Sequence, residues 1–313
     1  SRRSIPILNG NGKIETIKVP DEFNGSLRPY QHRGLDWLTF LHRWGFGACL
    51  ADDMGLGKTI EAIALFLAAR QRGTRGPILV VCPMSIMLKW AREISAFAPS
   101  FKTLLYHGAE RPRGDDFIKA IESYDVVITS YQLLCSESAA IRRVQWAIAV
   151  LDEAQNIKNA QTAKSRTARA LNASWRLALT GTPVENNVGD LWAIMDFLNP
   201  GLLLNQRDFV DRYQRPISMG SDPSIKDELR HLTAPFILRR LKSDPEIVPD
   251  MPPKVEEKVY CGLTKEQAEL YAAEVRDIDR GVTSREGIAR HGAVLALLTR
   301  LKQICNHPEQ YQK

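Results

Sequence analysis

The sequence of 313 residues is poor in cysteine, with five in all. No two of them form a Cys-x-x-Cys pair. The sequence therefore predicts neither a disulfide framework nor a cysteine zinc site, and it favours a reducing compartment. Long apolar runs are also missing. The longest candidate, Ile63 to Ala69, is far shorter than the ~20 residues that a membrane-spanning helix needs. We therefore expect a soluble protein with no membrane partner.

The first residues, Ser1 to Pro6, contain neither an initiator Met nor the apolar stretch of a signal peptide, which indicates a piece of a longer protein. The formal net charge is only +6, and the charged residues, 25% of the chain, carry both signs. A basic balance points to a nucleic acid only where the charges gather on one face, so charge alone predicts no polyanionic partner. The chain exceeds the usual ~100–200 residues of one domain, so we expect one large or two modest domains.

From about residue 45 the sequence alternates short β-branched runs with segments of helical periodicity. One such segment places Met87, Trp90, Ile94 and Phe97 on one face of a helix, and another opens at Thr59. Alternation of this kind predicts an α/β fold, a parallel sheet flanked by helices. The predicted strands are Ala48–Ala51, Ile78–Cys82, Thr103–Tyr106, Asp125–Thr129, Ala147–Leu151 and Arg176–Leu179.

After Pro183 the sequence becomes mainly helical. The predicted helices are Leu191–Leu198, Phe209–Tyr213, Leu229–Leu241 and Ala268–Val275. Four prolines between Pro245 and Pro253 indicate a linker, and Val255–Cys261 follows as an extended segment. Thr264 and Gln267 have the spacing of a capping box, which predicts a helix start.

A glycine-rich loop lies between the first predicted strand and the first predicted helix after it. It reads Asp52-Asp53-Met54-Gly55-Leu56-Gly57-Lys58-Thr59. In a phosphate loop, glycines let backbone N–H groups close on phosphate oxygens, the lysine reaches the β- and γ-phosphates and the threonine hydroxyl binds Mg²⁺. Asp52 stands where the first glycine of that pattern belongs. The alternative is a glycine-rich turn with a surface lysine, but the strand before and the helix after favour the phosphate loop.

Asp152 and Glu153 follow directly on the predicted strand Ala147–Leu151. The carboxyl ends of parallel strands form the edge where α/β sheets bind ligands. We therefore predict Asp152 as the metal carboxylate and Glu153 as the base that activates water, with Lys58 as the third catalytic residue. A solvated Asp-Glu turn is the alternative.

Three stretches together resemble motifs I, II and III of helicase superfamily two, and more narrowly the Swi/Snf family of DNA-dependent ATPases. They are Asp53–Thr59, Asp152–Asn159 and Leu179–Pro183. The resemblance runs from Leu27-Arg28-Pro29-Tyr30-Gln31 to Cys305-Asn306-His307-Pro308, nearly the whole chain. Gln155 is more similar to archaeal and bacterial members, which favours a cytoplasmic, nucleoid-associated protein; a eukaryotic one would be nuclear.

The resemblance implies a RecA-like lobe that binds ATP and Mg²⁺ and contacts the backbone of double-stranded DNA. It divides the chain into an extension (1–26), the lobe (27–185), a helical protrusion (186–250) and a lead (251–313) into a second RecA-like lobe of the same polypeptide. The parent protein would be an ATP hydrolase that moves on duplex DNA without separating its strands. Because the second lobe supplies arginines to the reaction, the chain alone is expected to hydrolyse ATP poorly.

The resemblance also assigns further residues. Gln31 would recognise adenine, against the alternative of a surface glutamine at a helix start. The nucleotide-binding set it implies is Arg28, Gln31, Asp53, Gly55, Leu56, Gly57, Lys58, Thr59 and Gln155. The DNA-contacting set is Pro83, Ser85, Thr129, Ser130, Thr180, Gly181 and Thr182.

Several alternatives stay open at this point. We expect Trp90 to lie in the core rather than to stack on a base. The basic residues Arg239, Arg240 and Lys242 fit a DNA contact or a solvated helix end equally well. A strand-separating helicase and a nucleotide-binding module without catalysis are the competing functions. A GTP-dependent switch is disfavoured, because the sequence contains no Asn-Lys-x-Asp motif.

Overall fold

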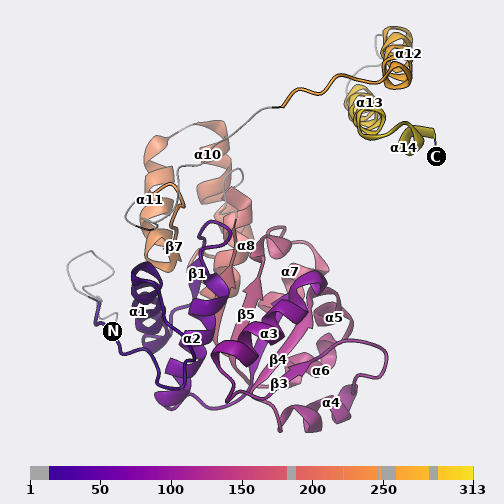
Figure 1. Cartoon of the computed structure of the whole chain (residues 1–313). Coiled ribbons are helices and arrows are strands. Elements are labelled where there is room, and N and C mark those ends of the chain that lie inside the picture. Colours follow the sequence, from indigo (N-terminus) through magenta and orange to yellow (C-terminus); the bar gives the residue numbers. More distant parts are fainter. Residues whose placement is uncertain are drawn as a thin grey trace. The chain divides into compact units, whose positions relative to one another are not determined.

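The computed structural model describes residues 14–181, 188–220, 222–244, 247, 259–281 and 288–312. The chain forms two units, residues 1–251 and residues 252–313 (Figure 1). The first unit holds the sheet and the motifs described above, and the second is helical. None of the helices in the described ranges is long and apolar enough to cross a membrane.

The first unit is built on a parallel sheet that has, among the described residues, seven strands in the order β3-β4-β2-β5-β6-β1-β7. Every pair of neighbouring strands is parallel, which confirms the predicted fold class. The six predicted strands are all present, and the seventh, β7, was missed. The strands are β1 Ala48–Leu50, β2 Ile78–Cys82, β3 Thr103–Leu105, β4 Val126–Ser130, β5 Trp146–Asp152, β6 Ala173–Leu179 and β7 Ile237–Leu238.

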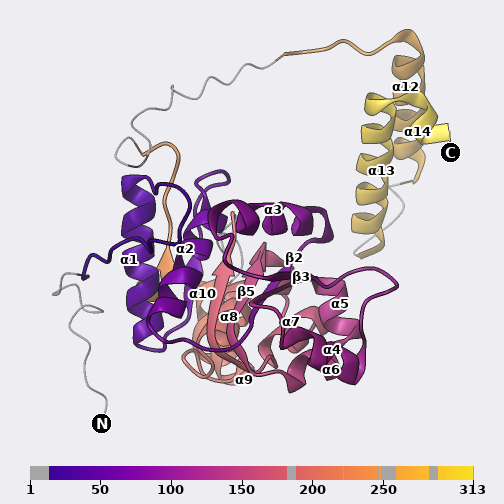
Figure 2. The same ribbon diagram turned by 60° about the horizontal axis from the view of Figure 1, so that its bottom comes forward.

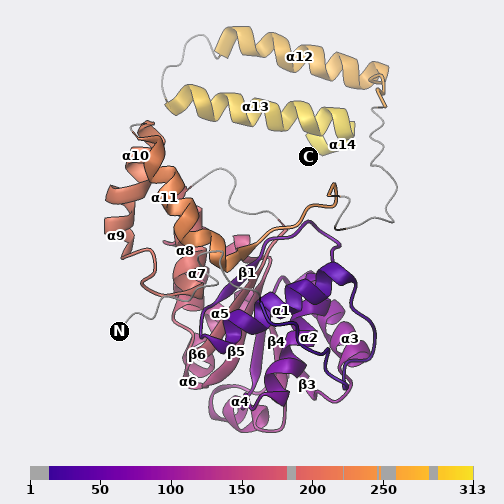
Figure 3. The same cartoon turned by 90° about the vertical axis from the view of Figure 1, so that its left-hand side faces the viewer.

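Helices cover both faces of the sheet (Figure 3). One layer consists of α1 Pro29–Arg43, α2 Lys58–Gln71 and α3 Met87–Phe97. The other consists of α4 Gly114–Ile121, α5 Tyr131–Ser136, α6 Ser138–Arg143, α7 Ala163–Arg169 and α8 Val188–Leu198. Because each face of β2, β4 and β5 is covered, these strands are buried along their whole length, as near-continuous apolar runs require.

After β6 the chain makes a helical excursion and then returns to the sheet. The excursion runs through α8, α9 Gln206–Phe209, a π-helical turn Val210–Gln214, α10 Arg215–Met219 and α11 Pro223–Thr233. It ends in β7, which pairs with β1 through Cys49 opposite Ile237 and Leu50 opposite Leu238.

The predicted helix Leu229–Leu241 is therefore wrong in its second half. The α-helix ends at Thr233 and a short 3₁₀ turn follows at Ala234–Phe236. Pro235 cannot donate the hydrogen bond that would continue the helix, and its ring crowds the preceding turn. Ile237 and Leu238 then gain a strand partner in β1.

The second unit consists of α12 Lys265–Gly281, α13 Ile288–Asn306 and α14 Pro308–Gln312, and α12 lies beside α13 (Figure 2). The predicted capping box is confirmed. The Thr264 N–H donates to Gln267 Oε1 at 2.9 Å, and the Gln267 N–H donates to Thr264 Oγ1 at 3.2 Å. The predicted linker 245–253 and the extended segment 255–261 lie mostly outside the described residues.

Candidate nucleotide-binding and catalytic site

The loop between β1 and α2 has a backbone that only glycine adopts easily. Gly55 and Gly57 have φ angles of 85° and 86°, in the left-handed region that favours glycine. A Cβ atom on Gly57 would lie 2.3 Å from Gln31 Nε2. Gly57 immediately precedes α2, so the loop opens onto a helix N-terminus, where backbone N–H groups and the helix dipole attract anions. The local geometry is that of a phosphate loop.

Lys58 begins α2, and its amine folds back onto the loop. It donates to the carbonyl oxygens of Asp52 at 2.7 Å and Asp53 at 3.2 Å. Burial lowers the pKa of Lys58, while the negative charges of Asp52, Glu153 and Asp152 act in the opposite direction. The loop lysine and the acidic pair at the end of β5 therefore share one edge of the sheet, as the sequence predicts.

The start of α1 holds the loop from the other side through the carbonyl of Leu56. Tyr30 Oη donates to this oxygen at 2.8 Å and Gln31 Nε2 donates to it at 3.1 Å. Gln31 Oε1 also accepts from the backbone N–H of Arg28 at 2.9 Å. Gln31 is buried, so the surface-glutamine alternative is wrong, and its contact with adenine stays a prediction.

Asp152 ends β5 and is 7% exposed. Its Oδ2 accepts from Trp90 Nε1 at 2.7 Å, and its Oδ1 accepts from the Glu153 N–H at 2.8 Å. Burial raises the pKa of Asp152, and the hydrogen bond from Trp90 opposes that rise. Tyr131 Oη donates to the Asp152 carbonyl at 2.8 Å. The carboxylate is thus held in one orientation at the sheet edge.

Glu153 turns the chain away from the strand in a left-handed conformation, with φ 51° and ψ 55°. A non-glycine residue in this region costs about 1 kcal/mol and recurs at functional sites. Glu153 Oε2 accepts from Gln155 Nε2 at 2.7 Å, and Thr180 Oγ1 donates to Gln155 Oε1 at 2.9 Å. A chain of hydrogen bonds therefore joins the ends of β5 and β6.

The residues assigned to DNA lie at or after the carboxyl ends of β2, β4 and β6. Ser85 is exposed. Thr129 is buried and its hydroxyl donates to the Tyr106 carbonyl at 3.3 Å, while Ser130 Oγ accepts from the Leu133 N–H and caps α5. The DNA-contact roles of Pro83, Ser85, Thr129, Ser130, Thr180 and Gly181 stay predictions, and Thr182 lies outside the described residues.

Sequence reasoning missed two kinds of contact near the site. Trp90 is in the core, as predicted, but its indole N–H also bonds Asp152. Arg240 is neither a DNA contact nor a solvated helix end, because it is 7% exposed and bonds Asp52 and Glu61. The sequence offered one signal for the second contact, the aspartate in place of the first loop glycine.

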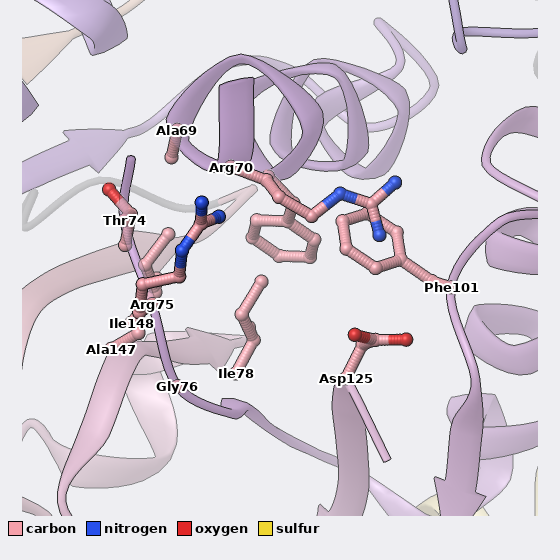
Figure 4. A pocket seen from close by; sticks show the side chains of 11 residues that line it. Ala69, Arg70, Thr74, Arg75, Gly76, Ile78, Phe101, Asp125, Ala147 and Ile148 are labelled. Atoms are coloured by element: carbon pink, nitrogen blue, oxygen red, sulfur yellow. The ribbon is translucent and has the colours of Figure 1, made fainter. Parts of the chain in front are cut away.

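A cavity of about 150 Å³ lies at the opposite edge of the sheet (Figure 4). It opens at the amino ends of β2 and β5, and Arg70, Arg75 and Asp125 are its charged lining residues. Arg70 donates to Ser100 Oγ at 2.6 Å and lies over the Phe101 ring. This cavity is therefore separate from the edge that carries Lys58 and Asp152.

The sheet order, the phosphate loop and the acidic pair at the end of β5 place the first unit in the RecA-like class of P-loop lobes. The chain belongs to the SNF2-related family, because the profile of the SNF2-related domain matches residues 30–310.

Two curated relatives show the range of similarity. The chain is 46% identical over 313 residues to YwqA of Bacillus subtilis, for which an ATP-dependent helicase or translocase activity has been suggested. It is 37% identical over 333 residues to the helicase SWR1 of Mycosarcoma maydis. The matches cover 100% and 99% of this chain but 34% and 18% of those relatives. The chain therefore spans about a third of the length of the first relative and about a fifth of that of the second.

A solved structure gives the same assignment. The Sulfolobus solfataricus SWI2/SNF2 ATPase core in complex with double-stranded DNA matches with a TM-score of 0.70 and 44% sequence identity. The match covers 94% of this chain and 61% of that one.

Proposed function

We propose that this chain is the ATP-binding half of a DNA-dependent ATPase that moves on double-stranded DNA and remodels protein–DNA complexes or DNA topology without separating the strands. The main support for this proposal is that Lys58, Asp152 and Glu153 lie together at one edge of the sheet. A phosphate-binding lysine beside a metal carboxylate and a second acid is what phosphoryl transfer requires.

The residues present fit ATP and Mg²⁺. The left-handed glycines leave room for phosphate oxygens where a side chain would intrude, and Lys58 can exchange its two carbonyl partners for phosphate oxygens. Asp152 and Thr59 would hold Mg²⁺ from the protein side. The described ranges contain no group of three or more His, Cys, Asp or Glu side chains that could hold a metal. Mg²⁺ in nucleotide sites takes most of its ligands from phosphates and water, so two protein ligands suffice.

The other site residues orient groups around the bound nucleotide. Glu153 would hold the proton of the attacking water, and Gln155 fixes the Glu153 carboxylate through the 2.7 Å bond. Thr180 fixes Gln155 in turn, so a change at the β6 end reaches the base. An arginine from a second lobe typically contributes ~10³–10⁵ in rate, and we expect the chain alone to bind nucleotide and turn it over slowly.

The SNF2-family membership and the DNA in the Sulfolobus complex support duplex DNA as the partner. The candidate contacts at the carboxyl ends of β2, β4 and β6 are mostly hydroxyls and backbone groups, which bind phosphate and sugar without reading base identity. Binding is therefore expected to be independent of sequence.

The test is the steady-state ATPase rate of the full-length protein with no nucleic acid, single-stranded DNA, duplex DNA and RNA. Stimulation by duplex DNA alone supports the proposal, and equal rates in all four contradict it. A strand-displacement assay with the same protein separates a translocase from a strand-separating helicase. Glu153→Gln in the full-length protein is expected to abolish turnover while ATP stays bound, and retained hydrolysis would refute the role of Glu153.

A further inference from the structure

The segment 237–242, which we name the strap, runs beside β1 and continues along the phosphate loop beyond the end of the strand (Figure 1). The Ala51 N–H donates to the Leu238 carbonyl at 2.8 Å and the Asp53 N–H donates to the Arg240 carbonyl at 3.1 Å. The side chains of the loop bond back. Asp52 Oδ1 accepts from the Arg240 N–H and Asp53 Oδ2 accepts from the Lys242 N–H, each at 2.9 Å. The strap therefore holds both residues that enter the loop.

The Arg240 guanidinium lies under the loop and all of its nitrogen atoms are bonded. Nε donates to Asp52 Oδ1 at 3.0 Å and Oδ2 at 3.1 Å, and Nη2 also bonds Asp52. Nη2 donates to Glu61 at 2.7 and 2.9 Å, and Nη1 donates to the Tyr30 carbonyl at 2.5 Å. The guanidinium also lies 5.2 Å from the centre of the Tyr30 ring. One side chain thus joins the loop, α2 and the start of α1.

The Asp52 carboxylate could not occupy its place without this partner. The residue is fully buried, and an ionised carboxylate in such surroundings needs a counter-charge and hydrogen bonds. The fit is also tight, because a Cβ atom on Gly34 would lie 1.9 Å from Glu61 Oε2 and 2.8 Å from Arg240 Nη1. The ordinary first glycine of a phosphate loop has no side chain to anchor. In this protein the loop carries the Asp52 carboxylate at that position, and Arg240 binds the carboxylate.

We propose that Arg240 is a positioning residue of the phosphate loop, which fixes the path of residues 51–55 through Asp52 and the strap. The proposal deepens the nucleotide-binding function proposed above and rests on it. Two further residues, one in the strap and one beyond it, lie close to the loop. Lys242 Nζ lies 3.0 Å from the position of a Cβ on Gly55, and Ile247 packs against Tyr30 and Leu56.

A purely structural role for Arg240 predicts a different result from a positioning role. Removing any buried arginine lowers stability, so the matched control is Arg176→Met. Arg176 is partly buried on β6, and its guanidinium donates to the carbonyls of Phe197 at 2.9 Å and Leu171 at 2.7 Å. Its hydrogen-bond partners lie outside the loop.

The first measurement is hydrogen–deuterium exchange of the 313-residue chain without nucleotide, at a temperature where each variant remains folded by circular dichroism. Arg240→Met is expected to speed exchange in peptides covering 51–57 by ~10-fold or more, which equals ~1.4 kcal/mol of local opening. Arg176→Met is expected to leave these peptides as in the wild type. If peptides covering 51–57 exchange equally slowly in Arg240→Met and in wild type, the proposal is overturned. This result does not depend on which ligand the chain binds, because the exchange is measured without nucleotide.

The second measurement is the dissociation constant of a fluorescent ADP analogue with Mg²⁺. Binding is expected to weaken ~10-fold or more in Arg240→Met and to stay unchanged in Arg176→Met. The variant Asp52→Gly/Glu61→Gln/Arg240→Met removes the three buried ionisable side chains together and restores the ordinary loop glycine, so it should recover affinity. If nucleotide affinity falls in both Arg240→Met and Arg176→Met, in step with the loss of thermal stability of each variant, the positioning role is refuted. A wild type that binds no nucleotide would refute the proposed function, while the exchange result still decides the role of Arg240.

Discussion

Replacing Trp90 with Phe tests how strongly the site is held around Asp152. The indole is 1% exposed and its N–H bonds the carboxylate at 2.7 Å. A hydrogen bond to a charged group contributes about 1.5–3 kcal/mol, whereas a neutral one contributes about 0.5–1.5 kcal/mol. Trp146 is the matched control, because it is equally buried and its indole donates to the neutral carbonyl of Ile141 at 2.9 Å. Both substitutions remove the same atoms, so Trp90→Phe is expected to cost about 1 kcal/mol more than Trp146→Phe at neutral pH.

The pH dependence separates the two variants further. Burial raises the pKa of Asp152, and the Trp90 bond opposes this, so removing the indole raises the pKa of Asp152 again. A carboxyl with a raised pKa in the folded state stabilises the fold at low pH, and that contribution is lost as the pH rises through the folded pKa. The extra cost of Trp90→Phe should therefore shrink on acidification. The cost of Trp146→Phe should stay constant, because its acceptor does not titrate.

The assay is urea unfolding followed by far-ultraviolet circular dichroism, in metal-free buffer, at neutral pH and at the lowest pH where the chain remains folded. The free energy of unfolding is compared among wild type, Trp90→Phe and Trp146→Phe. If Trp146→Phe is as costly as Trp90→Phe at neutral pH, or if the two costs depend on pH alike, the bond to Asp152 does not have the assigned strength.

Three further outcomes follow from the same structure. Gly57→Ala should strongly weaken binding of a fluorescent ADP analogue, because a φ angle of 86° strains any residue with a side chain and the new Cβ would also displace Gln31 Nε2 from its place 2.3 Å away; binding within ~2-fold of wild type contradicts this. Burial raises the pKa of Glu61 to about 8 against the opposing charge of Arg240. Stability from this group is thus lost progressively as the pH rises from about 4.5 to about 8, and urea titrations of Glu61→Gln should show a flatter pH profile over that range. Burial raises the pKa of Cys49 and Cys82 to about 12, so a thiol reagent should label exposed Cys261 rapidly and these two only after unfolding.

The local patterns of the sequence predicted most of the fold. Runs such as Ile78–Cys82 are long, β-branched and buried on both faces, so their composition alone identifies them as strands. The loop around Lys58 and the pair Asp152 and Glu153 were also predictable, because parallel strands bring their carboxyl ends to one edge. These features depend on a few neighbouring residues each.

The features that were missed depend on partners far apart in the chain. β7 has two residues and exists because β1 offers a free edge, so its own sequence carries no strand signal. Arg240 and Asp52 are 188 residues apart, and Trp90 and Asp152 are 62 apart. A basic residue at position 240 has the same local pattern whether it faces water, DNA or a buried carboxylate. Its role becomes visible only when the sheet is assembled.

Because the chain returns to the sheet at β7, the protein cannot be truncated from its C-terminal side before this strand without damage to the lobe. A fragment that stops near residue 185, after the last motif, would lose the strap and leave Asp52 and Glu61 buried without their arginine, a change that typically costs about 3–5 kcal/mol. The smallest piece expected to fold as a nucleotide-binding lobe must keep residues 237–242. For protein engineering, the crossover between β6 and β7 cannot be cut to a tight turn, because parallel strands need a connection of about a dozen residues or more. Its helix α8 also packs in the core of the sheet, so both α8 and the strap are integral parts of the lobe.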